Sequence, residues 1–360
     1  MTRTRHSAFL QTLFDAQAIA FAPFIFKAAS FALKTGLLEG IVHEPGLTSD
    51  AWAGRLGLTR YAVGMTVDLL VPARILTRAA DGSLSATPVG ECLALDDMTR
   101  ANFLFSDDVN FAGLAHADEA LREGRPAGLA AFSKDWKTIY PHLPELPQDA
   151  KASWFRFDHF HSDRAYEAAL EILASAFPEK PEGPTRLADI GGNTGRFSAA
   201  FLRRFPRATA VLVDLPAETE ALAGRSELAD VLPRLSAASI DWLTPAPLEG
   251  TDGCDLYWMS QFLDCFSFEE AASILKRTAA AMADGAKLAV LEPLVDEQRH
   301  PAAEISLAAT SLYFAVMANG NSRFFKGAEI RTLFAESGFA VESEHPNLGI
   351  SHTLFVLTKA

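Results

Sequence analysis

The segment Leu187-Ala-Asp-Ile-Gly-Gly-Asn-Thr-Gly195 carries the clearest chemical signal in this chain. Its glycines allow a tight turn and let backbone amides approach a ligand closely. The spacing of Gly191, Gly192 and Gly195 does not fit the G-x-G-x-x-G pattern of nicotinamide sites, and no Gly-Lys-Ser/Thr follows as in a phosphate loop. The carboxylate of Asp189 beside the turn would repel a pyrophosphate, so it favours a cationic or zwitterionic ligand.

A second acid, Asp214, closes the next apolar run in Leu-Val-Asp-Leu-Pro. An acid at the end of a second strand can accept hydrogen bonds from both hydroxyls of a ribose. Taken singly, Asp189 is equally well explained as a turn cap and Asp214 as a solvated strand end. Together, in a strand–loop–helix context, they favour a ligand with a ribose and a positive charge, and S-adenosylmethionine has both.

The elements that must position these acids begin at Pro181, where short apolar runs alternate with helical patterns. The runs have the length of buried parallel strands and are 187–190, 210–214, 255–259 and 288–292, with helices expected over 196–205 and 268–282. This alternation predicts an α/β fold with a Rossmann-like doubly wound sheet. The runs 339–344 and 353–357 predict a closing antiparallel pair.

The first hundred residues predict helices followed by one hairpin. Helices are expected over 26–38, over 49–56 after a Thr48 cap, and over 60–75, and Asp81-Gly82 marks a hairpin between 76–78 and 84–86. This order is typical of a winged helix. We therefore expect a winged-helix domain over 1–100, a helical, aromatic-rich linker and substrate-lining region over 101–180, and a catalytic domain over 181–360.

Composition and charge exclude several classes of function. The 360 residues contain 32 Lys and Arg against 45 Asp and Glu, a net charge of −13, which opposes binding to nucleic acid or anionic lipid. A winged helix can read DNA, but the helix expected over 60–74 is apolar, which disfavours a DNA-binding regulator. The three cysteines form no CxxC pair, so we expect neither a disulfide framework nor a metal site, and a cytoplasmic location. Charged residues and Pro23 interrupt the apolar stretch 8–33, which predicts an amphipathic helix rather than a signal peptide.

The motifs Asp-x-Gly-Gly-x-x-Gly, Asp-Leu-Pro and Leu-Glu-Pro resemble those of the S-adenosylmethionine-dependent small-molecule O-methyltransferases, which include plant phenolic, acetylserotonin and bacterial polyketide enzymes of secondary metabolism. The resemblance spans nearly the whole chain. It implies a class I methyltransferase with an N-terminal winged-helix dimerisation domain, and S-adenosylhomocysteine as the product of the cofactor. The residues implied to bind the cofactor are Asp189, Gly191, Gly192, Asn193, Gly195, Asp214, Leu215, Asp241, Trp242, Ser260 and Gln261. Among these, Asp241 would accept from the adenine amino group and Trp242 would pack on the ring, although a core role explains Trp242 equally well.

The sequence departs from this family at the general base, a histidine in a Leu-His-Asp-Trp stretch. Alignment on Glu269-Glu270 places Asp264 at the histidine position, and Ser260 stands where the family often has lysine. An aspartate of pKa ~3.9 is a weak base for a phenol of pKa ~10 unless burial raises its pKa. We therefore expect Asp264 to be catalytic with Glu292 beside it. His161 is the alternative base, although it can equally be a surface or satisfied histidine.

The helix around Trp154–Phe160 is rich in aromatic residues and predicts a flat, apolar substrate. The expected substrate contacts are Trp154, Phe157, Asp158, His161, Tyr313, Met317 and Asn321. Tyr313 and Met317 can alternatively be core, and one asparagine of Asn319-Gly320-Asn321 a helix cap. We predict methyl transfer to the oxygen of a small aromatic, phenolic substrate. Ring C-methylation and a relative that binds the cofactor without methylating stay open.

The N-terminal stretch also predicts self-association. Six phenylalanines lie between Phe9 and Phe31, and so much apolar surface on a monomer would aggregate. We expect a homodimer that buries this stretch.

Overall fold

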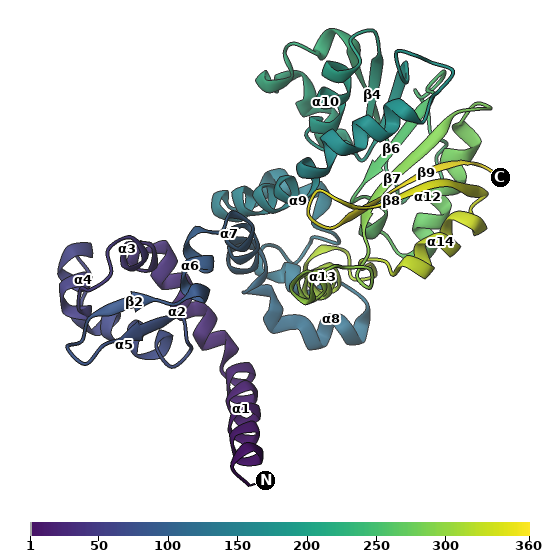
Figure 1. Cartoon of the computed structure of the whole chain (residues 1–360). Helices are drawn as coiled ribbons and strands as arrows, with labels where there is room; N and C mark the ends of the chain where they lie inside the picture. Colours follow the sequence, from purple (N-terminus) through teal and green to yellow (C-terminus); the bar gives the residue numbers. More distant parts are fainter. Residues whose placement is uncertain (1) are drawn as a thin grey trace. The chain divides into compact units, whose positions relative to one another are not determined.

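The computed structural model describes the backbone of residues 2–360 and the side chains from residue 8 onward. The chain divides into two compact units, residues 1–107 and 108–360 (Figure 1). The middle region that the sequence set apart, 101–180, is shared between them. Its separate role in lining the substrate stays a prediction.

The first unit consists of helices and one hairpin. Its elements are α1 (Thr2–Ala20), α2 (Ala22–Lys34), α3 (Leu37–His43), α4 (Ser49–Leu56), α5 (Arg60–Leu70), β1 (Leu76–Arg78), β2 (Leu84–Ala86), α6 (Pro88–Leu95), α7 (Asp97–Leu104) and the short π-helix η1 (Phe105–Asn110). The predicted α4 and hairpin are confirmed, and the Thr48 side chain accepts from the amide of Ala51 at 3.3 Å.

Two helices of this unit end earlier than predicted. The helix expected over 26–38 ends at Lys34, and the chain turns through Gly36 with φ +75° before α3. The helix expected to reach Ile75 stops at Leu70. Val71 still has helical dihedral angles, and Pro72 explains the end of the helix because it has no N–H to continue the hydrogen-bond ladder.

A buried acid ties α2 to the end of the first unit. The Asp107 side chain is fully buried and accepts from Lys27 Nζ at 2.7 Å and Ser30 Oγ at 2.6 Å, with Lys34 Nζ at 2.5 Å. Burial opposes ionisation, but these hydrogen bonds hold the pKa of Asp107 below its usual value.

The apolar N-terminal stretch forms α1 and α2, which are bent by 69° at their junction. Large apolar side chains stay exposed along it, including Phe9 (62%), Ile19 (77%) and Phe24 (65%). By length and composition alone, this bent pair and the helical segment 301–318 pass a test for membrane spans, which core helices and signal sequences also pass.

The second unit contains the sheet. Its longer elements are α8 (Ala117–Glu123), α9 (Gln148–Ser175), β3 (Arg186–Ile190), α10 (Arg196–Arg204), β4 (Thr209–Asp214), α11 (Pro216–Ala221), β5 (Leu235–Ser239), β6 (Leu256–Ser260), α12 (Phe268–Ala281), β7 (Lys287–Pro293), α13 (Pro301–Tyr313), α14 (Gly327–Glu336), β8 (Phe339–Leu348) and β9 (His352–Lys359). Short helical turns used below are η4 (Tyr140–Glu145), η8 (Leu263–Cys265) and η9 (Phe314–Ala318).

The seven strands lie in the order β5-β4-β3-β6-β7-β9-β8. All neighbours are parallel except that β9 runs antiparallel to both β7 and β8. The four predicted parallel strands and the closing antiparallel pair are confirmed. The sequence missed β5, because Leu-Ser-Ala-Ala-Ser is a short edge strand with little apolar content.

Helices cover both faces of the sheet (Figure 1). Helices α12 and α14 pack with Val213, Met259 and Val290 on one face. Helices α9 and α10 pack with Leu212 and Trp258 on the other. The carboxyl ends of the parallel strands therefore share one edge, where ligands bind in such sheets.

Candidate active site

The glycine turn follows β3 at the carboxyl edge of the sheet. Gly191 and Gly195 have φ of +67° and +77°, and Asn193 between them has φ +48°. A Cβ built on Gly191 would lie 2.2 Å from a ring carbon of Phe262, and one on Gly192 would also meet a side chain below 3 Å. The glycines are therefore required both by backbone conformation and by close packing.

The Asp189 side chain turns inward as a local cap, which was the alternative explanation from the sequence. Its side chain is 1% exposed, and its Oδ2 accepts from the amide of Ser198 at 3.1 Å and from Ser198 Oγ at 2.6 Å. Burial raises its pKa to about 6, opposed by these two hydrogen bonds. The carboxylate turns inward to the first residues of α10, so it holds the turn against the helix.

Asp214 closes β4 and fastens the glycine turn to it. Its Oδ2 accepts from the amide of Asn193 and its Oδ1 from the amide of Leu215, both at 2.7 Å. Burial raises its pKa to about 7. Each carboxylate oxygen keeps a second lone pair for a ligand hydroxyl.

Two buried polar atoms beside this turn support a ligand site. Asn193 Oδ1 and Ser260 Oγ, at the ends of β3 and β6, are buried without a hydrogen-bond partner among the described residues. Buried polar groups are rarely left unpaired. A polar ligand such as S-adenosylmethionine would satisfy them, so the residues present fit this cofactor.

Of the two residues expected around adenine, Asp241 stays a prediction and Trp242 lies in the core. Asp241 is exposed, and its Oδ1 accepts from the amide of Leu243 at 3.0 Å within its own turn. Trp242 is 5% exposed and packs edge-on against Phe262, with ring centroids 5.1 Å apart. Trp242 is therefore a core residue, which was the alternative reading of the sequence. Gln261 has φ +48°, a strained conformation next to the site.

Asp264 and Glu292 come together, as predicted. Both are buried, at 1% and 0% exposure. Glu292 Oε1 accepts from the amides of Phe262 and Leu263 at 3.0 and 2.9 Å. Burial raises the pKa of Asp264 to about 6 and that of Glu292 well above its usual value. Burial therefore raises the pKa of Asp264, which is the condition under which an aspartate becomes a useful base.

Helix α9 connects the glycine turn to the aromatic side chains. Trp154 Nε1 donates to the hydroxyl of Tyr313 at 2.9 Å, so these two predicted substrate contacts lie together. One turn later, Asp158 Oδ2 accepts from Asn193 Nδ2 at 3.2 Å. Burial raises the pKa of Asp158 to about 7, with Asp264 as one of the nearby charges. Asp158 therefore contacts the glycine turn and lies near the carboxyl of Asp264.

His161 is a poor base in this structure. Its ring packs on those of Phe157 and Phe160, with centroids 4.7 and 5.7 Å away. Burial lowers its pKa to about 4, and it lies near His352, whose pKa burial lowers to about 3. An imidazole with so low a pKa binds a proton weakly at neutral pH.

Two other residues that the sequence placed near the substrate are Met317 and Asn321, and their role in binding stays a prediction. Met317 is fully buried in η9 and fills the space beside Gly113 and Gly128, so it is core. Asn321 is exposed and its amide points to Glu270 at 3.4 Å. Asn319 instead reaches the catalytic segment, since its Nδ2 donates to the carbonyl of Cys265 at 2.5 Å. The reversal at Gly320, with φ +87°, turns the second asparagine outward.

Sequence reasoning missed Tyr140 and Cys265. The Tyr140 hydroxyl is buried without a hydrogen-bond partner among the described residues, and it lies near Cys265 and Asp264. Cys265 occupies the position after Asp264, with its Sγ 3.4 Å from Asp264 Oδ1. Tyr140 lies in an irregular segment that gave no signal. In the part of the chain that the structure describes, no group of three or more His, Cys, Asp or Glu could hold a metal.

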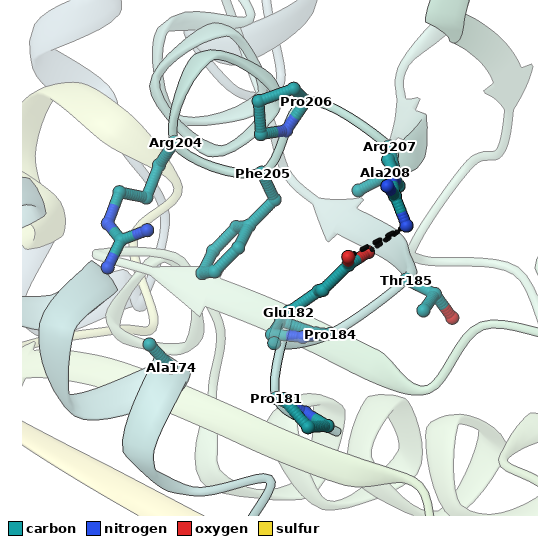
Figure 2. A pocket seen from close by; sticks show the side chains of 11 residues that line it. Ala174, Pro181, Glu182, Pro184, Thr185, Arg204, Phe205, Pro206, Arg207 and Ala208 are labelled. Atoms are coloured by element: carbon teal, nitrogen blue, oxygen red, sulfur yellow. Dashed lines mark hydrogen bonds and ion pairs between the residues drawn. The ribbon is translucent and has the colours of Figure 1, made fainter.

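A cavity of about 380 Å³ lies at the opposite edge of the sheet, where β3 and β4 begin (Figure 2). Phe205 lines it, Arg207 pairs with Glu182 at 2.7 Å and Arg204 with Glu171 at 2.9 Å. It contains none of the site residues described above. Because its arginines are paired, we assign it no function.

Comparison with known proteins places this geometry in a family. Residues 170–340 match the O-methyltransferase domain. Phenazine O-methyltransferase PhzM of Lysobacter antibioticus is 30% identical over 318 residues, which cover 88% of this chain and 87% of that protein. The structure of the mitomycin 7-O-methyltransferase MmcR matches with TM-score 0.74 at 20% identity over 99% of both chains. That of the O-methyltransferase NcsB1 from neocarzinostatin biosynthesis, in complex with S-adenosylmethionine and 2-hydroxy-5-methyl naphthoic acid, matches with TM-score 0.69 at 19% identity over 93% of this chain and 96% of that one. With the glycine turn and Asp214 at the carboxyl edge of its sheet, the chain belongs to the S-adenosylmethionine-dependent O-methyltransferase family.

Proposed function

We propose that this enzyme methylates a hydroxyl group on a small, flat aromatic compound of secondary metabolism. One observation carries the proposal. The buried carboxyls of Asp264 and Glu292 lie at the same sheet edge as the glycine turn, and Asp158 on α9 is close to both. Trp154 lies one turn away on the same helix and donates to the hydroxyl of Tyr313 on α13.

The chain's own residues would divide the work as follows. Gly191, Gly192 and Gly195 shape the turn, and Asp214 accepts from the ribose of the cofactor. When bound, S-adenosylmethionine supplies an electrophilic methyl group on a sulfonium. Trp154 offers an aromatic surface to orient a ring, and Asp264 accepts the proton of the substrate hydroxyl. Holding the two reactants in line supplies much of the rate.

The relatives guide the choice of substrates to test. PhzM is named for phenazines, and NcsB1 was crystallised with a naphthoic acid. The site here contains aromatic side chains and buried acids, and these acids would repel a carboxylate on the substrate. We therefore expect hydroxyphenazines and naphthols to be better substrates than hydroxybenzoates.

The test uses purified protein, methyl-labelled S-adenosylmethionine and a panel of hydroxyphenazines, hydroxynaphthoates, naphthols and hydroxybenzoates. The expected product is a methyl ether, which releases its label on ether cleavage. Retention of the label on the ring carbon would reject O-transfer. Binding of cofactor without any turnover would favour a non-methylating member.

Ring C-methylation is a second candidate, favoured by Asp264 at the family's histidine position. The ring carbon ortho to a phenolate is also nucleophilic, and a carboxylate near the hydroxyl promotes both reactions. The same labelled products distinguish them.

We also propose that the enzyme is a cytoplasmic homodimer. The exposed apolar side chains of α1 and α2, including Phe9, Ile19 and Phe24, support this because a lone chain would leave them in water. The net charge of −13 supports the absence of nucleic acid and membrane partners.

A further inference from the structure

In the pair of buried carboxyls, Asp264 and Glu292, the two oxygens of Glu292 differ in the hydrogen bonds that they accept. Oε1 of Glu292 receives two backbone amides, from Phe262 and Leu263. Oε2 of Glu292 is buried and has no N–H or O–H donor among the described residues. Asp264 directly follows Leu263, whose amide binds Glu292, and its carboxyl is the nearby charge that most raises the pKa of Glu292. Two neighbouring carboxyl groups can hydrogen-bond to each other only if one of them carries a proton.

Within the described part of the chain, none of the causes that shift the pKa values of the two carboxyls is a cation. The titratable groups that face the pair from the neighbouring elements are neutral or acidic, namely Cys265 of η8, Tyr140 of η4, Tyr313 of α13 and Asp158 of α9. The thiol of Cys265, 3.4 Å from Asp264 Oδ1, is a weak donor. Two adjacent buried carboxyls without a cation cannot both ionise, so the pair holds a single negative charge.

We propose that Asp264 and Glu292 share one proton and act together as the base, with Glu292 as the inner member and Asp264 as the outer one. This inference rests on the proposed methyl transfer to a hydroxyl. It explains how an acid replaces histidine at this position. A lone exposed aspartate, with pKa ~3.9, holds a proton poorly at neutral pH, whereas the second ionisation of a proton-sharing pair lies higher.

The pair also accounts for the proton that the substrate hydroxyl releases during methyl transfer. The proton of the substrate hydroxyl passes to the free oxygen of Asp264, and the singly charged pair becomes neutral. The substrate oxygen forms a bond to the methyl carbon, and the electron pair of the broken carbon–sulfur bond stays on sulfur. The proton leaves the pair to solvent after product release.

The decisive experiment needs no substrate. Infrared difference spectra in H₂O and D₂O between pH 5 and 9 report the carbonyl stretch of a protonated carboxylic acid. We compare the wild type with Asp264→Asn and Glu292→Gln, and use Asp230→Asn as the control, since Asp230 is exposed and paired with Arg203. Asp158, Asp189 and Asp214 also have raised pKa values and contribute to this signal in every protein, so the signal of the pair is the difference between the wild type and each variant at pH 7. The control should match the wild type.

Sharing predicts that either substitution alone removes that signal. In Asp264→Asn the new amide donates to Oε2, so Glu292 ionises. In Glu292→Gln the new amide donates to Asp264, which ionises in turn. If the signal survives Asp264→Asn and disappears only in Glu292→Gln, then Glu292 is an independent neutral acid and the proposal is wrong.

Calorimetry with S-adenosylhomocysteine accompanies every variant. Unchanged affinity shows that the fold and the cofactor site are intact. If Glu292→Gln does not fold, Asp264→Asn alone decides, because sharing requires loss of the signal there. If the protein shows the infrared signal of the pair but methylates no compound of the substrate panel, the proposed reaction is rejected. The proton-sharing pair is then still supported.

Discussion

Replacement of Asp214 by asparagine tests the cofactor site most directly. In the free protein its two oxygens each accept one backbone amide at 2.7 Å, from Asn193 and Leu215. An amide group keeps one acceptor and presents a donor in place of the other. One backbone N–H therefore loses its partner, which costs about 1–3 kcal/mol of stability in the turn.

The loss of cofactor affinity should be larger. Two ribose hydroxyls donating to a charged acceptor contribute about 1.5–3 kcal/mol each, or about 3–6 kcal/mol together. Since about 1.4 kcal/mol is tenfold, Asp214→Asn should weaken S-adenosylhomocysteine binding by about 10²–10⁴-fold. The assay is isothermal titration calorimetry, with Asp230→Asn as an exposed control that should bind like the wild type.

The pH dependence provides a second readout for the same variant. Burial raises the pKa of Asp214 to about 7, so the folded protein protonates it below that pH. Because only the carboxylate accepts from both hydroxyls, wild-type affinity should be flat above pH 8 and fall below pH 7. The variant should lack this fall. An affinity within threefold of the wild type, or an unchanged pH profile, would refute the assignment of Asp214 to the ribose.

Three further variants test packing, the first unit and the dimer. Gly191→Ala puts a Cβ 2.2 Å from Phe262 at φ +67°, so it should destabilise the second unit by about 2–4 kcal/mol, measured by urea unfolding; an unchanged midpoint would contradict the packing. Asp107→Asn removes a buried acceptor of lysine and serine donors and should cost about 1–3 kcal/mol at pH 7. Because the pKa of Asp107 is lowered, that stabilisation is present at neutral pH and lost on acidification through its pKa, so the two proteins should converge in acid unfolding. By light scattering, the wild type should have the mass of a dimer and the double variant Ile19→Glu/Phe24→Glu that of a monomer. A monomeric wild type would reject the dimer.

Much of the fold follows from local patterns in the sequence. Parallel strands such as β4 are continuous apolar runs, and α4 begins at the threonine that caps it. β5 has no such run, because its residues are small and it lies at the edge. Helix ends at Gly36 and Leu70 were misplaced because one glycine and one proline outweigh apolar periodicity.

The sequence predicts the position of a residue at the sheet edge where that residue ends a strand. Asp214 and Glu292 end strands, so their place at the sheet edge follows from the topology. The direction of a side chain does not follow from spacing. Asp189 turns back to Ser198, and Asn319 rather than Asn321 reaches the catalytic segment. Tyr140 arrives from an irregular segment far away in sequence, which no periodicity anticipates.

Helix α9 has a consequence for how such an enzyme can change its substrate during evolution. Trp154 and Asp158 lie four residues apart on one rigid element, which fixes their separation along the axis at about 6 Å. The first contacts Tyr313 and the second the glycine turn. Inserting or deleting one residue between them would rotate one end by about 100° relative to the other. Under the proposed function, the helix fixes the distance between the substrate ring and the methyl donor. New specificities should then arise by exchanging side chains while the length of the helix is kept.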